Sequence, residues 1–146
     1  MDPIKTPCDN LFEARPYLIF TSLLYSIPCI YAYYISEYYH SFICFLTILF
    51  SVNYWRYPIA GLRRTIDICM ATFSVIYTLY HIFMYITPPI SYLCYYFNAI
   101  GILLFNFSCK LHEYGYSYWY KMHIFMHIFI LCSVVLSMHE LYGSIY

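Results

Sequence analysis

Long hydrophobic runs follow one another along the chain, separated by short polar segments. Five runs are present, and they occupy residues 16–36, 41–54 (or 38–54), 65–86, 90–109 and 118–138. A helix rises ~1.5 Å per residue, so about 20 apolar residues cross the ~30 Å hydrocarbon core of a bilayer. The runs are too long and too uniformly apolar for the strands of a membrane barrel. The pattern predicts an all-α transmembrane bundle of about five spanning helices.

Polar segments flank this transmembrane domain, which we place at residues 16–138. A short arm, residues 1–15, precedes it and is expected to be irregular or interfacial, and a short tail, residues 139–146, follows it. Pro16 stands where a helix can begin, because the first turn needs no backbone N–H there. Pro28 lies inside the first run, where we expect a kink, since a proline ring clashes with the carbonyl four residues earlier.

Composition strengthens the membrane prediction and excludes other classes. Hydrophobic residues make up 63% of the chain and charged residues only 10%, whereas a soluble domain carries roughly 25% charged residues. A water-facing fold of this composition would expose large apolar patches. The formal net charge of zero gives no basic face for nucleic acid. Lipids are the expected partners, and other membrane subunits are a second candidate.

The seven Lys and Arg residues predict the orientation of the bundle. With five spans, all of them fall on the side of the N-terminus or at its edge: Lys5, Arg15, Arg56, Arg63, Arg64, Lys110 and Lys121. The positive-inside rule then places the N-terminus inside and the C-terminus outside. Arg56, Arg63 and Arg64 form a basic patch that suits lipid headgroups or an acidic partner. Organellar, endomembrane and viral membranes are all compatible with this topology.

Four polar side chains inside the runs fall at one depth. His123 and His127 are four residues apart and share one helix face, and a His pair at this spacing can chelate a metal ion. Asp67 begins the third run, and Ser51 lies one turn from the end of the second. All four are expected near the inner interface. Ionisable residues within a membrane are functional candidates, so we treat the four as one candidate site.

The order and spacing of these four residues resemble the membrane superfamily of alkaline ceramidases and progestin/adipoQ receptors. In that family a Ser-xxx-His motif ends the second helix, an Asp begins the third, and a late helix supplies His-xxx-His. The resemblance implies a His-bound zinc ion that activates a water molecule, and a lipid amide as substrate. It assigns catalytic roles to Ser51 and Asp67, and metal-ligand roles to His123, His127 and Asp67.

The chain departs from that family in two ways. Trp55 stands where the family has its third His ligand, and the chain has five runs rather than seven. Without that His, a zinc site needs Asp67 or a loop group such as His112 as a ligand.

Each candidate residue also has an interpretation that involves no site. Asp67 can stabilise a helix N-terminus beside Arg63 and Arg64, and Ser51 can hydrogen-bond a carbonyl of its own helix. The two His residues can contact lipid headgroups or neighbouring Tyr hydroxyls at the interface.

Other polar residues lie outside this cluster. His81 is fourteen residues beyond Asp67, or ~21 Å along a helix, so it belongs near the outer interface. It can pair there with Glu37, His40 or Glu140. Two residues of the fourth run can hydrogen-bond between helices: Asn98 and Asn106. Asn98, near the middle of the membrane, can instead line a pore.

Two functions are compatible with the sequence. The first is a non-catalytic structural or accessory component of a membrane assembly, in agreement with the short loops and the few intramembrane polar groups. The second is a metal-dependent lipid-amide hydrolase with a site at the inner interface. A transporter usually shows paired halves or broken helices in corresponding positions, and the sequence shows no such repeat.

Overall fold

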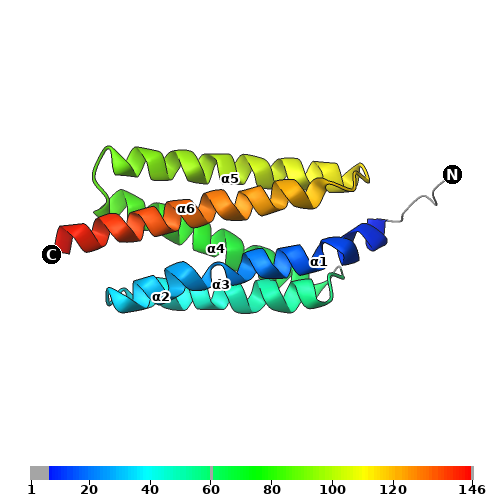
Figure 1. The fold of residues 1–146 in the computed structure, drawn as a ribbon, viewed down its shortest axis with the longest axis horizontal. Coiled ribbons are helices and arrows are strands. Elements are labelled where there is room, and N and C mark those ends of the chain that lie inside the picture. Colours follow the sequence, from blue (N-terminus) through cyan, green and yellow to red (C-terminus); the bar gives the residue numbers. More distant parts are fainter. Residues whose placement is uncertain (1–6, 60, 146) are drawn as a thin grey trace.

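The computed structural model describes residues 7–59 and 61–145, and the side chains of residues 12–59 and 61–143. These residues form six helices and no strand: α1 (Pro7–Leu23), α2 (Ser26–Tyr34), α3 (Tyr38–Arg56), α4 (Leu62–Tyr85), α5 (Ile90–Glu113) and α6 (Trp119–Ile145). The helices lie along one common direction, with α1 and α2 following each other as one broken rod (Figure 1). The prediction of an all-α helical bundle is confirmed.

Four helical segments of the described chain are long and apolar enough to cross a membrane. They are 12–34, 62–85, 90–113 and 119–143. The 19-residue α3 is not among them, because Tyr, His, Asn and Arg residues occupy its two ends. It nevertheless lies alongside the other rods and packs against α1, α2 and α4 (Figure 1).

The predicted kink in the first span is present as a complete break. α1 ends at Leu23 and α2 begins at Ser26. Pro28 has no N–H to offer the carbonyl of Leu24, four residues earlier, and its ring would clash with that carbonyl in a continuous helix. The Leu24 carbonyl instead accepts from the backbone N–H of Ile27 at 3.0 Å.

Both ends of the chain are more helical than predicted. The arm was expected to be irregular up to residue 15, but α1 already begins at Pro7, and Pro16 lies inside it; residues 1–6 lie outside the described chain. At the other end, the helix α6 continues through most of the segment expected as a short tail, up to Ile145. Met138 and Leu141 explain this continuation, since both are buried in one cluster with Ala32 and Ile82.

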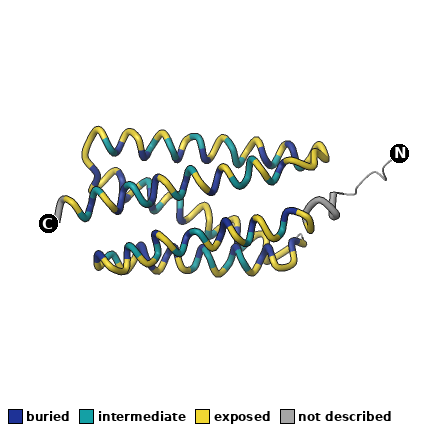
Figure 2. The backbone as a smooth tube through the Cα atoms, viewed as in Figure 1, coloured by how far each residue is buried: buried dark blue, intermediate teal, exposed yellow. Residues whose placement is uncertain are grey.

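Large apolar side chains cover the outside of the bundle, and small polar ones fill much of its interior. Phe83 and Leu103 are 76% and 68% exposed. Exposed residues follow the outer faces of the helices, while buried ones point toward neighbouring helices (Figure 2). The buried polar side chains include eight Ser, three Thr and three His residues. This distribution suits lipid as the solvent, because intramembrane helices associate through small and polar residues.

The α5–α6 contact is the closest helix pair. Asn98 Nδ2 donates to Ser133 Oγ at 2.6 Å and to the Cys94 carbonyl at 3.0 Å, which confirms the predicted interhelical bond. Gly101 permits this approach, since a Cβ there would lie 2.7 Å from Ile130 Cγ1. Asn106 does not bond between helices, because its Nδ2 donates to the Ile102 carbonyl of its own helix.

Candidate functional site

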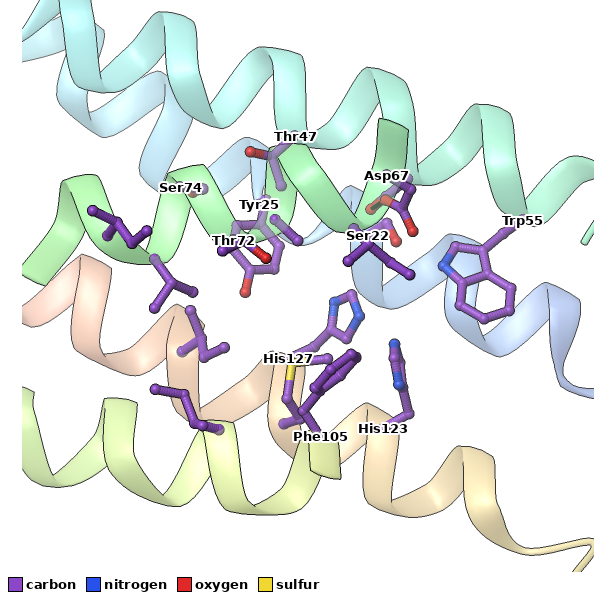
Figure 3. A pocket seen from close by; sticks show the side chains of 18 of the residues that line it. Ser22, Tyr25, Thr47, Trp55, Asp67, Thr72, Ser74, Phe105, His123 and His127 are labelled. Atoms are coloured by element: carbon purple, nitrogen blue, oxygen red, sulfur yellow. Dashed lines mark hydrogen bonds between the residues drawn. The ribbon is translucent and has the colours of Figure 1, made fainter. Parts of the chain in front are cut away.

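A cavity of about 360 Å³ lies inside the bundle, between α3, α4 and α6. The break between α1 and α2 contributes Tyr25, and α5 contributes Ile102 and Phe105. Most of the lining is apolar, and the polar side chains gather toward one end (Figure 3). On α4 the lining extends from Asp67 to Leu79, which is ~18 Å along the helix axis. The cavity is therefore elongated along α4.

All four residues of the predicted site line this one cavity. Ser51 comes from α3, Asp67 from α4, and His123 and His127 from α6. The two imidazole rings are 5.0 Å apart between centroids, at an angle of 47°. Both rings point from α6 into the space that Asp67 faces from the opposite wall (Figure 3). Helices far apart in sequence thus bring these side chains together, whereas the roles assigned to them stay predictions.

The carboxylate of Asp67 is held by a direct contact across the α3–α4 interface. Ser51 Oγ donates a hydrogen bond to Asp67 Oδ1. Both side chains are buried, while Arg63 and Arg64 on the preceding turn of α4 are exposed. The interpretation in which Ser51 bonds its own helix carbonyl is wrong, because its hydroxyl is directed to the neighbouring helix. Asp67 is the sixth residue of α4 rather than a member of its first turn.

Aromatic rings enclose the first histidine. The His123 ring lies 5.6 Å from that of Trp55, 6.0 Å from Phe105 and 6.1 Å from Trp119. Its Nδ1 is 3.4 Å from Ser108 Oγ. The His123 ring points from α6 toward the cavity, with Trp55 and Phe105 beside it (Figure 3).

The second histidine lies deeper in the bundle. His127 is 8% exposed, and the Tyr25 ring meets it edge-on at 5.8 Å and 82°. Its Nδ1 is buried without a hydrogen-bond partner among the described residues. A buried imidazole nitrogen without a partner is costly, so this atom is available to a polar group in the cavity. The interpretation of both histidines as interfacial residues that face headgroups does not describe His127.

Several lining residues were not part of the predicted site. The hydroxyl residues among them are Ser22, Tyr25, Thr47, Thr72 and Ser74. Trp55 was noted only as a departure from the family motif, yet it forms the end wall beside His123 (Figure 3). The sequence did indicate one of these residues. Thr47 lies four residues before Ser51 and therefore on the same helix face.

The described residues do not fit the zinc site that the resemblance implies. No group of three His, Cys, Asp or Glu side chains in the described part of the chain is placed to hold a metal ion. Trp55 occupies the position of the missing ligand, and Ser51 already engages Asp67. His112 is not in the cavity lining and packs against Trp119 at 5.0 Å. The cavity lining thus holds two imidazoles and the Asp67 carboxylate, but these three side chains do not come together as a metal-binding group.

The basic patch lies away from the cavity. Arg56 ends α3, and Arg63 and Arg64 begin α4, and all three side chains are exposed. Arg63 also lines a shallow surface depression with Tyr57 of the connecting loop. The patch is therefore exposed, whereas its contact with headgroups or with a partner stays a prediction.

Comparison of the chain with protein-family models, with characterised proteins and with solved structures finds no match. The relationship to ceramidases stays a prediction that rests on the order and spacing of four residues: Ser51, Asp67, His123 and His127.

Proposed function

We propose that this chain is a multispan integral membrane protein that holds the chain of a lipid in its cavity and serves as a non-catalytic component of a membrane assembly. The cavity carries this proposal. Its walls are apolar along α4 and α6, where Val75, Leu79 and Ile130 line it, and its polar groups gather at the end of Asp67 and the two histidines. A lipid has the same division between an apolar chain and a polar head.

The cavity also reaches the outer surface of the bundle. Ile68 and Ile76 of α4 and Ile102 of α5 line it, and they are 40%, 60% and 42% exposed. Their exposure places an opening between α4 and α5, on a face covered by apolar side chains. A lipid can enter sideways through such an opening without carrying its acyl chain through water.

We propose five crossings, with the N-terminus inside. In support, the α3–α4 and α5–α6 connections lie at the end of the bundle where α1 begins. The α2–α3 and α4–α5 connections lie at the opposite end (Figure 1). At the end of the bundle where α1 begins, five basic residues lie within three turns of a helix terminus: Arg56, Arg63, Arg64, Lys110 and Lys121. The positive-inside rule assigns that end to the inside.

Labelling with a photoactivatable phospholipid tests the lipid site. The purified chain, reconstituted with a phospholipid that carries a diazirine on its acyl chain, is expected to be labelled on cavity peptides of α4 and α6. Val75→Trp should abolish this labelling, because an indole there fills the apolar part of the cavity. Peptide mapping by mass spectrometry measures the labelled sites.

Phe45→Trp is the matched control, because Phe45 is 52% exposed on α3 and does not line the cavity. It should leave labelling of the cavity peptides unchanged. Labelling that covers only the outer faces of the helices, or that Val75→Trp does not alter, contradicts a lipid site in this cavity.

The convergence of Ser51, Asp67, His123 and His127 favours a second candidate function, a hydrolase that acts on lipid amides. In this role the imidazoles and the carboxylate face a lipid head in one cavity. Metal content of the detergent-purified chain separates the two candidates, with wild type beside the double variant His123→Ala/His127→Ala. We expect no stoichiometric metal, because no three ligand side chains come together among the described residues. About one zinc ion per chain, lost in the double variant, would instead support the hydrolase.

A further inference from the structure

Polar residues continue from the cavity along the interface of α3 and α4. Five residues of α4 are buried, and four of these are polar: Asp67, Ser74, Thr78 and His81, with Ile82 as the fifth. The facing side of α3 buries Ser51, Thr47 and, at its far end, His40. We call this row the α3–α4 polar seam. It covers ~21 Å between Asp67 and His81, which is most of the thickness of a hydrocarbon core.

Two histidines close the far end of the seam. His40 and His81 are 1% and 3% exposed, and their rings meet edge-on at 5.2 Å and 82°. Of the partners predicted for His81, His40 contacts it, but the contact is between the two rings and no hydrogen bond joins them. Both ring nitrogens of His81 and Nδ1 of His40 are buried without hydrogen-bond partners among the described residues.

Other buried side-chain atoms of the described bundle also lack a hydrogen-bond partner, among them Asn98 Oδ1 and His127 Nδ1, but among the described histidines only His81 has both ring nitrogens in this state. In the α5–α6 contact the amide nitrogen of Asn98 makes two hydrogen bonds, as expected of a polar residue that holds helices together. A histidine used only for packing would be satisfied in the same way, since an unpaired buried donor or acceptor costs ~1–3 kcal/mol. His81 has neither nitrogen engaged, so its position is not explained by helix packing.

We propose that the α3–α4 polar seam conducts protons between the cavity and the far end of the bundle, with His81 and His40 as the relay. A neutral imidazole accepts a proton on one nitrogen and releases the proton of the other, so a relay needs both nitrogens free. His81 meets this requirement. Chains of ionisable residues within membranes mark proton pathways.

The spacing of the seam suits transfer in short steps. Ser74, Thr78 and His81 follow one another at one helical turn each, which is ~4.5–6 Å along the axis. A single bridging water spans a gap of this size. Ser74 and Thr47 line the cavity, so the seam opens into a space of about 360 Å³. That space holds several waters beside polar groups.

The far end of the seam leads to the surface. Tyr77 and Tyr85 of α4 contact the pair, with Tyr77 5.3 Å from His40 and Tyr85 5.0 Å from His81. Glu37 is half-buried one turn before His40, and Cys44 lies one turn after it. A metal ion suits the pair less well, since no third His, Cys, Asp or Glu joins it among the described residues. The protons come from bulk water on one side and return to bulk water on the other.

A flux measurement on the full chain tests the proposal. The protein is reconstituted into vesicles that contain a pH-sensitive dye, and a potassium gradient with valinomycin supplies the driving potential. Wild type is expected to acidify the vesicle interior faster than protein-free vesicles do. His81→Gln should lose this flux, because an amide side chain cannot accept a proton at one atom and release one from another.

Thr78→Val is the second variant, since it removes one hydroxyl at nearly constant volume and should also lose the flux. His139→Gln is the matched control, because His139 is exposed on α6 and bonds Tyr31, so its flux should equal wild type. Size-exclusion profiles and circular dichroism establish that each variant is folded. A wild-type flux equal to that of protein-free vesicles, or one that both His81→Gln and Thr78→Val retain, overturns the proposal. The result of the flux measurement does not depend on the result of the lipid photolabelling, so the two proposals can fail separately.

Discussion

Leu103→Arg is expected to lower the membrane integration of the chain by an apparent free energy of about 2.5–3.5 kcal/mol. Leu103 lies near the middle of α5 and is 68% exposed on the outer face. A guanidinium at this position would be placed among acyl chains with no polar group beside it. The integrated fraction of the full chain, measured with a glycosylation reporter appended after α6, gives the size of the effect.

Tyr114→Arg provides the matched control. Tyr114 is 76% exposed, like Leu103, but it follows the last residue of α5, where a positive charge reaches headgroups and water. It should leave integration unchanged. Equal integration of Leu103→Arg and wild type would show that the outer face of α5 does not meet lipid, and the membrane-spanning arrangement would be wrong.

Ser51→Ala is expected to destabilise the bundle by about 1.5–3 kcal/mol, the usual contribution of a hydrogen bond to a charged group. The substitution removes the hydroxyl that donates to Asp67 Oδ1 and leaves a buried carboxylate without that donor. The apparent Tm in detergent should fall accordingly. Ser137→Ala is the control, because Ser137 is equally buried but donates only to the Val134 carbonyl of its own helix.

A double variant distinguishes the hydrogen bond from a general packing effect. Ser51→Ala/Asp67→Leu replaces both partners with apolar groups, and such replacements are often nearly neutral. The double variant should therefore be more stable than Ser51→Ala alone. If the two changes simply add, or if Ser51→Ala behaves like Ser137→Ala, the interhelical bond does not stabilise the bundle.

The helices themselves were largely predictable from the sequence, because their cause is local. Runs of apolar residues long enough to cross a bilayer specify where the chain must satisfy its backbone hydrogen bonds internally. The break in the first span was predictable from Pro28 for an equally local reason, since in a continuous helix its ring would clash with the carbonyl of Leu24. The residues at which the helices end were less predictable from the sequence. The extension of α6 to Ile145 depends on the burial of Met138 and Leu141 against other helices.

The level of the four site residues along the bundle axis could also be predicted from the sequence. Ser51, Asp67, His123 and His127 were expected at one level because a helix rises by a constant amount per residue. That level is the polar end of the cavity they line. Which side chains contact one another depended on how each helix is rotated about its own axis. A nearly uniform apolar run carries little amphipathic signal, so the sequence did not indicate which face of α3 points inward.

The sequence by itself therefore determined that this chain is a bundle of long apolar helices, and where along the helix axes its polar residues lie. Only the tertiary structure decided which of these residues meet. It directed Ser51 to Asp67 instead of its own helix, placed His81 against His40 and left the nitrogens of His81 unpartnered. The physical reason is that rise along a helix is set by the backbone, whereas contact between helices depends on how side chains of several segments pack together.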